Sequence, residues 1–112
     1  LPPGAPHQLI AGEGIETVLS AHSALPDWHA VAALSAAHLA AFEPPPELAR
    51  LAIALDADDA GRQAARRLRQ RAETRHLTVI ELQPCFNDFN QDLCCYGRDH
   101  LQRHLRQQIG SD

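Results

Sequence analysis

The sequence predicts an α/β fold: a compact open sheet of about four mainly parallel strands flanked by helices. Short apolar runs of strand length alternate along the 112 residues with segments of helical periodicity. Such alternation implies crossover connections and a parallel sheet. The length suits one domain over residues 1–112. The chain begins with Leu1 and contains no methionine, so we expect it to be a piece of a longer protein.

In the first half of the chain, glycine and proline separate two pairs of a strand and a helix. Gly12 stops the first apolar run, and Pro26 ends the helical segment that follows it. The prolines at 44–46 stop the second helix, and those within 2–6 indicate an extended entry. The expected elements are a strand over Gln8–Ala11, a helix over Ile15–Ala24, a strand over His29–Leu34 and a helix over Ala36–Phe42 with Ser35 as its N-cap.

The second half repeats the pattern with a longer helix. Small and apolar residues recur every four positions from Ala60 to Ala72, which is typical of one buried helix face. Near the C-terminus, Leu101, Leu105 and Ile109 have the spacing of another inward-facing stripe. The expected elements are a strand over Leu48–Leu55, a helix from Asp59 to about Arg75, a strand over Leu77–Leu82 and a helix over Asp99–Ile109.

Composition and charge argue against several classes of protein. No apolar run of about 18 residues and no basic leader is present, so we expect a cytoplasmic protein without a membrane partner. The net charge of −4 does not suit a domain that grips nucleic acid unaided. Cys85, Cys94 and Cys95 lack metal-ligand spacing and are expected to be reduced thiols. His100 and His104 have no accompanying acidic motif, so zinc is not expected there.

Acidic side chains follow three of the four expected strands. The carboxyl ends of parallel strands form one edge, where open α/β sheets bind ligands, so we expect these acids to converge. Two carboxylates about 5 Å apart repel by roughly 3 kcal/mol at an effective dielectric constant of about 20, and Mg²⁺ is the ordinary ion to lie between them. The acids are Glu13 after the first strand, Asp56 and Asp58 after the third, and Asp88 and Asp92 after the fourth.

A structural alternative exists for Glu13, Asp56 and Asp59, which could serve only as acids that stabilise helix N-termini. The glycines on both sides of Glu13 favour a ligand site, because they let the backbone turn tightly and approach a ligand closely. Six of the ten arginines lie between Arg62 and Arg75. They could contact phosphates, but a solvated helix surface is the preferred interpretation, except for Arg62 beside the aspartates.

Three segments together resemble the motifs of the Toprim domain, which bacterial-type DNA primases, topoisomerases and some nucleases share. The likeness covers nearly the whole chain and is greatest to primases of plasmids, phages and integrated elements. It implies a compact, Rossmann-like Toprim fold. The segments are Glu13-Gly14-Ile15-Glu16-Thr17, Asp56-Ala57-Asp58-Asp59-Ala60-Gly61-Arg62 and Asp88-Phe89-Asn90.

The resemblance implies the catalytic module of a DNA primase, which makes RNA primers by metal-dependent nucleotidyl transfer. The implied partners are template DNA, nucleoside triphosphates, Mg²⁺ or Mn²⁺, and adjoining zinc-binding, basic or helicase regions of the parent protein. The isolated domain is expected to be inactive alone. The implied roles are Glu13 as general acid or base and as a metal ligand, Asp56 and Asp58 as metal ligands with catalytic roles, Asp88 as a second-metal ligand, and Gly14, Gly61, Arg62 and Asn90 at the substrate phosphates.

The sequence departs from the family pattern at two positions. Thr17 stands where the family has an aspartate, and Glu16, about 100° away round the helix, is a poor substitute. Asn90 stands where a further acid often follows Asp88. Both losses weaken a second metal site unless substrate phosphates supply the missing anions.

Two other functions use the same motifs. A Mg²⁺-dependent nuclease would use the same acids with water as the attacking group. A non-catalytic Toprim-like module would bind nucleic acid or nucleotides without reacting. A phosphoaspartate phosphatase or receiver based on Asp56 lacks the Thr/Ser and Lys signals expected of it.

Overall fold

Four strands form one sheet in the computed structural model, which describes residues 7–56, 58–85 and 88–110. All strand pairings in this part of the chain are parallel, and the order is β2-β1-β3-β4. The expected α/β class and strand number are confirmed, whereas the expected entry at 2–6 lies outside the described residues. The strands are β1 (Gln8–Gly12), β2 (His29–Ala32), β3 (Arg50–Ala54) and β4 (Thr78–Leu82).

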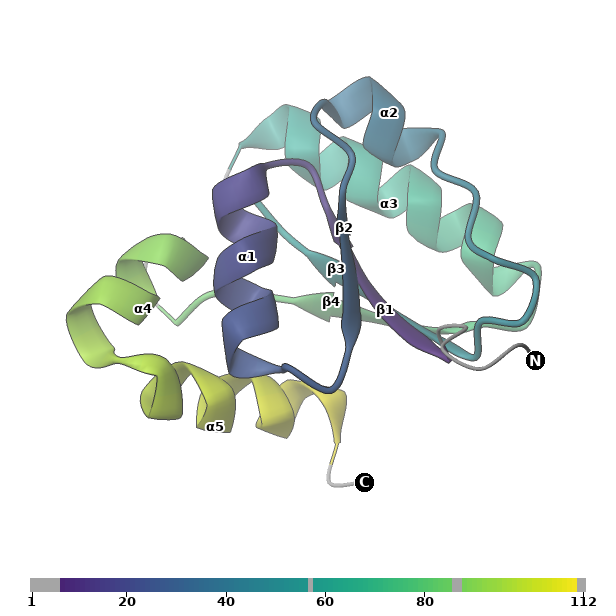
Figure 1. The fold of residues 1–112 in the computed structure, drawn as a ribbon. Helices are drawn as coiled ribbons and strands as arrows, with labels where there is room; N and C mark the ends of the chain where they lie inside the picture. The colour runs from purple at the N-terminus through teal and green to yellow at the C-terminus, as the bar shows by residue number, and fades with distance from the viewer. Residues whose placement is uncertain (1–6, 57, 86–87, 111–112) are drawn as a thin grey trace.

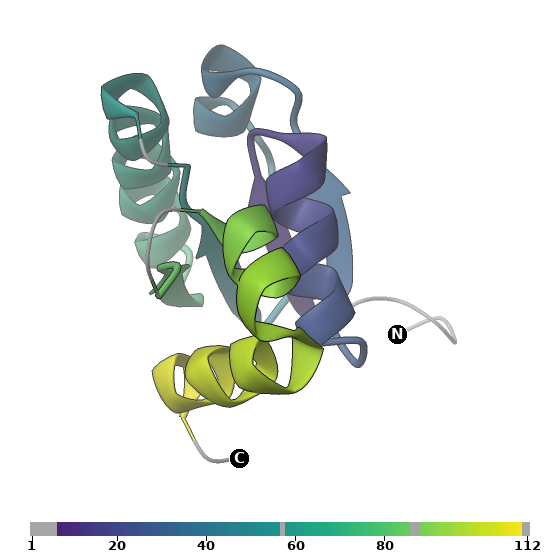
Figure 2. The same ribbon diagram turned by 90° about the vertical axis from the view of Figure 1, so that its left-hand side faces the viewer.

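Helices cover both faces of the sheet. One layer holds α1, α4 and α5, and the other holds α2 and α3 (Figures 1 and 2). None of the helices in the described ranges is long and apolar enough to cross a membrane. The helices are α1 (Ile15–Ala24), α2 (Ala36–Ala40), α3 (Asp59–Glu73), α4 (Phe89–Tyr96) and α5 (Arg98–Ile109).

Most expected elements are present, and the boundaries that moved have local causes. Ser35 caps α2 as expected, because its side chain accepts a hydrogen bond from the N–H of His38 at 3.1 Å. The second strand ends at Ala32 because Leu34 adopts a φ of 76°, which a strand cannot continue through. Helix α2 ends at Ala40, before Phe42, and Arg71 donates hydrogen bonds to the carbonyl oxygens of both residues.

Helix α4 is the element that sequence periodicity missed. Its eight residues bury only Phe89 and Asp92, so they show no apolar stripe that could be read as a helix. The helix begins at Asp88, whose side chain accepts a hydrogen bond from the N–H of Gln91 at 2.7 Å. Phe89 is fully buried against α1 and α5, and it fixes the third acidic segment to the core.

The strands divide their side chains between two apolar cores, because successive strand residues point to opposite faces. In β1, Ile10 joins the core under α1, α4 and α5, while Leu9 joins the core under α2 and α3. In β3, Ala52 and Leu51 divide in the same way. The inward stripe expected at the C-terminus is confirmed, since Leu101, Leu105 and Ile109 all lie in the first of these cores.

The two central strands create a topological switch point. Gly12 at the end of β1 pairs with Ala54 at the end of β3, and Ala54 pairs with Leu82 at the end of β4. Three strands therefore end level with one another. Because α1 packs on one face of the sheet and α3 on the other, the chain leaves β1 and β3 in opposite directions. Open α/β sheets bind ligands outside such an edge.

Replacing Phe89 by alanine should lower the free energy of unfolding by about 3–5 kcal/mol, because it leaves a cavity in the core beneath α4. Cys95→Ala on the same helix is the control, since Cys95 is exposed and its change should stay within about 0.5 kcal/mol. Urea unfolding of both variants measures this. A loss below about 1 kcal/mol for Phe89→Ala would show that α4 is not anchored by this side chain.

Candidate functional site

Glu13 is the first residue after β1, and the loop after β2 fixes its backbone. The N–H groups of Ala33 and Leu34 donate to the carbonyl oxygens of Gly12 and Glu13, each at 2.8 Å. A Cβ at Gly12 would lie 3.1 Å from the carbonyl oxygen of Ala54. The same Cβ would lie 2.8 Å from Val18 Cγ2 of α1, so the glycine before Glu13 is favoured by the close packing of α1 and β3 against β1, rather than by an unusual turn.

The acids of β1 and β3 meet around Gly61, in the first turn of α3. A Cβ at Gly61 would lie 3.0 Å from Asp58 Oδ1, 3.4 Å from Glu13 Oε1 and 3.4 Å from the Cβ of Asp56. Asp58 is the N-cap of α3, and its Oδ1 accepts a hydrogen bond from the N–H of Gly61 at 2.6 Å. The structure thus brings Glu13, Asp56 and Asp58 together, while their chemical roles stay predictions.

Thr17 has a contact that the sequence did not reveal. Its hydroxyl donates a hydrogen bond to Asp56 Oδ1 at 2.5 Å, and its side chain is 8% exposed. In the sequence, Thr17 was notable only because it stands where the family has an aspartate. In the structure, the hydroxyl of Thr17 is a hydrogen-bond donor that holds Asp56 in place, where the family's aspartate would carry a negative charge.

An open cleft of about 410 Å³ joins the three acidic segments. A second cleft of about 460 Å³ contains Glu13, Gly14 and the exposed Leu34, and the two clefts share Asp56. Glu16 lines both clefts. This was not expected from the sequence, because Glu16 lies about 100° round the helix from Thr17. The residues of the first cleft are Glu16, Thr17, Asp56, Asp58, Asp88 and Asn90.

Asp92 does not join the acidic edge, which corrects the expectation that both acids after the fourth strand reach it. Its side chain is 1% exposed within α4 and accepts a hydrogen bond from the N–H of Cys85. This carboxylate therefore ties the turn after β4 to the helix. Because α4 was not recognised in the sequence, the buried face that carries Asp92 could not be identified either.

Arg62 lies on the first turn of α3 but lines neither cleft. Its guanidinium forms an ion pair of 3.3 Å with Asp59, and both side chains are largely exposed. Such surface pairs contribute little and exchange readily. Arg62 is therefore free to turn toward a bound anion, and Asp59 is a surface acid outside the cluster.

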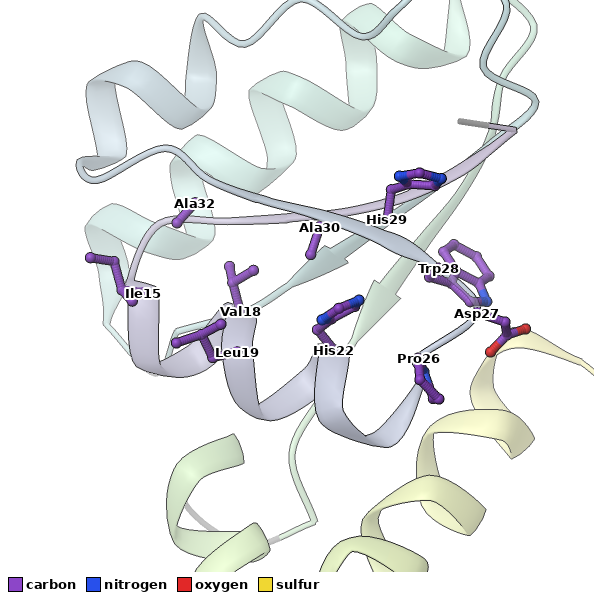
Figure 3. Close-up of a pocket in the computed structure, with 10 residues that line it drawn as sticks. All are labelled: Ile15, Val18, Leu19, His22, Pro26, Asp27, Trp28, His29, Ala30 and Ala32. Atoms are coloured by element: carbon purple, nitrogen blue, oxygen red, sulfur yellow. The ribbon is translucent and has the colours of Figure 1, made fainter. Parts of the chain in front are cut away.

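Another pocket lies between α1 and β2, at the edge of the sheet (Figure 3). It has a volume of about 440 Å³ and contains Val18, Leu19 and Trp28, with His22 and His29 at its polar positions. None of the predicted site residues lines it. The acidic cluster and this apolar pocket are separate features of the molecule.

Glu13 is the electrostatically strained member of the cluster. Burial raises its pKa above the usual 4.5, and the negative charges of Asp58 and Asp56 raise it further. Its Oε1 is buried and has no hydrogen-bond partner in the described part of the chain. A buried, unpaired carboxylate oxygen among other carboxylates is stabilised by a proton or a cation.

The fold and the cluster define a class of protein, an α/β domain with an acidic edge at its switch point. A family model described as the Toprim domain matches residues 8–99. The chain therefore belongs to the Toprim domain family, whose members are metal-binding modules that process nucleic acids and occur in primases and nucleases. A search of curated proteins found no match.

Toprim domains generally bind Mg²⁺, and the residues at this edge fit such an ion. Mg²⁺ prefers oxygen ligands, which Glu13, Asp56 and Asp58 supply around Gly61. The unpartnered Glu13 Oε1 is the observation that favours a cation most directly. As the side chains stand in the described ranges, no three His, Cys, Asp or Glu residues are close enough to enclose one.

Replacing Glu13 by glutamine should stabilise the metal-free protein near neutral pH. Because the pKa of Glu13 is raised in the folded state, the folded state binds more protons than the unfolded state at pH values between 4.5 and the raised pKa. The free energy of unfolding therefore falls as the pH rises through this range. Glutamine keeps the shape of the side chain without the charge. Urea unfolding in EDTA should show a gain near neutral pH that disappears below pH 4.5.

Glu47→Gln, at an exposed position in the loop before β3, is the matched control and should show no such gain. A Glu13→Gln variant that is less stable than the parent near neutral pH would mean that the carboxylate has a stabilising partner in solution.

Proposed function

We propose that this domain carries the nucleotidyl-transfer site of a DNA primase, which joins nucleoside triphosphates into a primer on template DNA. The observation that supports the proposal most is the meeting of Glu13, Asp56 and Asp58 around Gly61, beside a cleft that also contains Asp88 and Asn90. All three family motifs therefore contribute residues to the same part of the sheet edge. A reaction between two substrates requires such a shared site, because both must be held close together.

Glu13, Asp56 and Asp58 would hold Mg²⁺ or Mn²⁺, and Asp88 would contribute to a second ion. The bound metal supplies charge stabilisation for the attacking and leaving oxygens of an in-line displacement at the α-phosphate. The carboxylate of Glu13, beside the ion, would accept the proton of the attacking 3′-hydroxyl.

The remaining predicted residues would receive the triphosphate. Gly14 lines the second cleft, where a Cβ would be in ordinary van der Waals contact with Asp56, 3.7 Å from its Oδ2. Gly61 is surrounded by the acids, and a Cβ at this position would crowd Asp58 Oδ1 most, at 3.0 Å. The amide of Asn90 lines the cleft as a neutral hydrogen-bonding group, and Arg62 would exchange Asp59 for a phosphate.

Template DNA would need a basic surface from outside this domain. Of the six arginines of the segment 62–75, Arg62 pairs with Asp59 and three others pair with further acids, which leaves Arg66 and Arg67 exposed and without an ion pair in the described part of the chain. The adjoining zinc-binding, basic or helicase regions expected in the parent protein would supply the rest. The three other paired arginines are Arg69 with Glu73 and Glu81, Arg71 with Glu43 and the carbonyls of Ala40 and Phe42, and Arg75 with Glu43.

Glu13→Gln in the full-length parent protein should reduce primer synthesis by about 10²-fold or more, because it removes the proton acceptor but keeps its shape. The assay measures incorporation of labelled nucleoside triphosphates on single-stranded templates, with Glu47→Gln as the control. Activity of Glu13→Gln within a few-fold of the parent would remove Glu13 from the mechanism. If the parent instead cleaves the template and Glu13→Gln does not, the nuclease alternative holds.

The 112-residue domain should bind single-stranded DNA weakly and with strong salt dependence, because its net charge is −4 and few of its arginines are free. Fluorescence anisotropy with a labelled oligonucleotide should show Kd values above about 1 μM at physiological salt, where each neutralised phosphate contributes about one unit of salt slope. Tighter binding, lost in Arg66→Gln/Arg67→Gln, would make α3 the main DNA-binding element.

A further inference from the structure

The three aspartates of the site share a feature that goes beyond their position. Each has one carboxylate oxygen in a hydrogen bond, and the other oxygen accepts none from the residues that the structure describes. The bonds run from Thr17 Oγ1 to Asp56 Oδ1 at 2.5 Å, from the N–H of Gly61 to Asp58 Oδ1 at 2.6 Å, and from the N–H of Gln91 to Asp88 Oδ1 at 2.7 Å.

Asp56 differs from the other two in the group that holds it. Asp58 and Asp88 are helix N-caps, so backbone N–H groups fix them as part of starting a helix. Asp56 depends on the side chain of Thr17, which lies 39 positions away in the sequence and belongs to α1. Because Thr17 is buried, its hydroxyl has little freedom to turn elsewhere.

A carboxylate held in this way binds cations differently from a free one. An oxygen that accepts a short hydrogen bond has one lone pair fewer to offer, and the bond also restricts rotation of the group. Ca²⁺ takes six to eight oxygens and often both oxygens of one carboxylate, whereas Mg²⁺ requires near-ideal octahedral geometry with single oxygens and retained water. Three aspartates with one free oxygen each suit the smaller ion.

We propose that Thr17 is a specificity-determining residue, whose hydrogen bond to Asp56 makes the site favour Mg²⁺ and Mn²⁺ over Ca²⁺. The inference rests on the proposed function, since it concerns the cation of the same site. It gives the departure from the family pattern a role: the lost negative charge at position 17 is exchanged for control over the orientation of Asp56.

Competition between Mn²⁺ and Ca²⁺ tests the proposal, with electron paramagnetic resonance reporting free Mn²⁺. Thr17→Val keeps the shape of the side chain without the hydroxyl, Thr17→Ala removes both, and Thr17→Ser is the control that keeps the donor. The preference for Mn²⁺ over Ca²⁺ should fall about tenfold in Thr17→Val and Thr17→Ala. This is about the change in affinity expected from the loss of one hydrogen bond to a charged group. In Thr17→Ser it should stay within about twofold.

Two outcomes would overturn the proposal in distinguishable ways. Binding of Mn²⁺ by the parent, with the same Mn²⁺ preference in Thr17→Val and Thr17→Ala, would leave the proposed metal site intact and remove Thr17 from its selectivity. Absence of Mn²⁺ binding by the parent protein would refute the metal site itself. Thermal unfolding in EDTA identifies any variant that fails to fold. If one of Thr17→Val and Thr17→Ala fails, the Mn²⁺ preference of the other tests the proposal.

Discussion

The repulsion between carboxylates at the end of β1 and β3 is the constraint around which this domain is organised. Glu13, Asp56 and Asp58 lie close enough that a single Cβ at Gly61 would touch all three residues. Burial raises the pKa of Glu13, the charges of Asp58 and Asp56 raise it further, and Glu13 Oε1 has no hydrogen-bond partner in the described part of the chain. A fold that holds such a cluster together in the absence of a counter-charge must fix each acid separately.

The structure fixes each acid by a different device. The N–H of Leu34 in the loop after β2 donates to the backbone carbonyl of Glu13, the N–H of Gly61 donates to Asp58, and the hydroxyl of Thr17 donates to Asp56. These donors come from three different segments, the loop after β2, α3 and α1, which meet because β1 and β3 are adjacent and their chains leave on opposite faces of the sheet. The acidic site is therefore a consequence of the strand order 2-1-3-4 as much as of the motifs themselves.

The sequence could predict the strands, the longer helices and the edge at which the acids lie, because apolar periodicity and strand-end position are local patterns. It could not predict α4, whose short buried face is Phe89 and Asp92, nor the structural role of Asp92 that depends on this helix. The hydrogen bond between Thr17 and Asp56 could not be predicted from the sequence either. It joins two elements whose relative placement follows only from the packing of α1 beside β3.

The central claim, that the acids of the strand ends form one cation site, is tested most directly by NMR of the ¹⁵N-labelled 112-residue chain during addition of substoichiometric Mn²⁺. Paramagnetic broadening depends steeply on distance from the ion. The amide signals of Glu13, Gly14 and Gly61 should be lost first, while the indole signal of Trp28, which precedes β2 and so lies toward the opposite edge of the sheet, should persist longer. Broadening centred on exposed acids such as Glu43 and Glu47, with the Gly61 signal preserved, would contradict it.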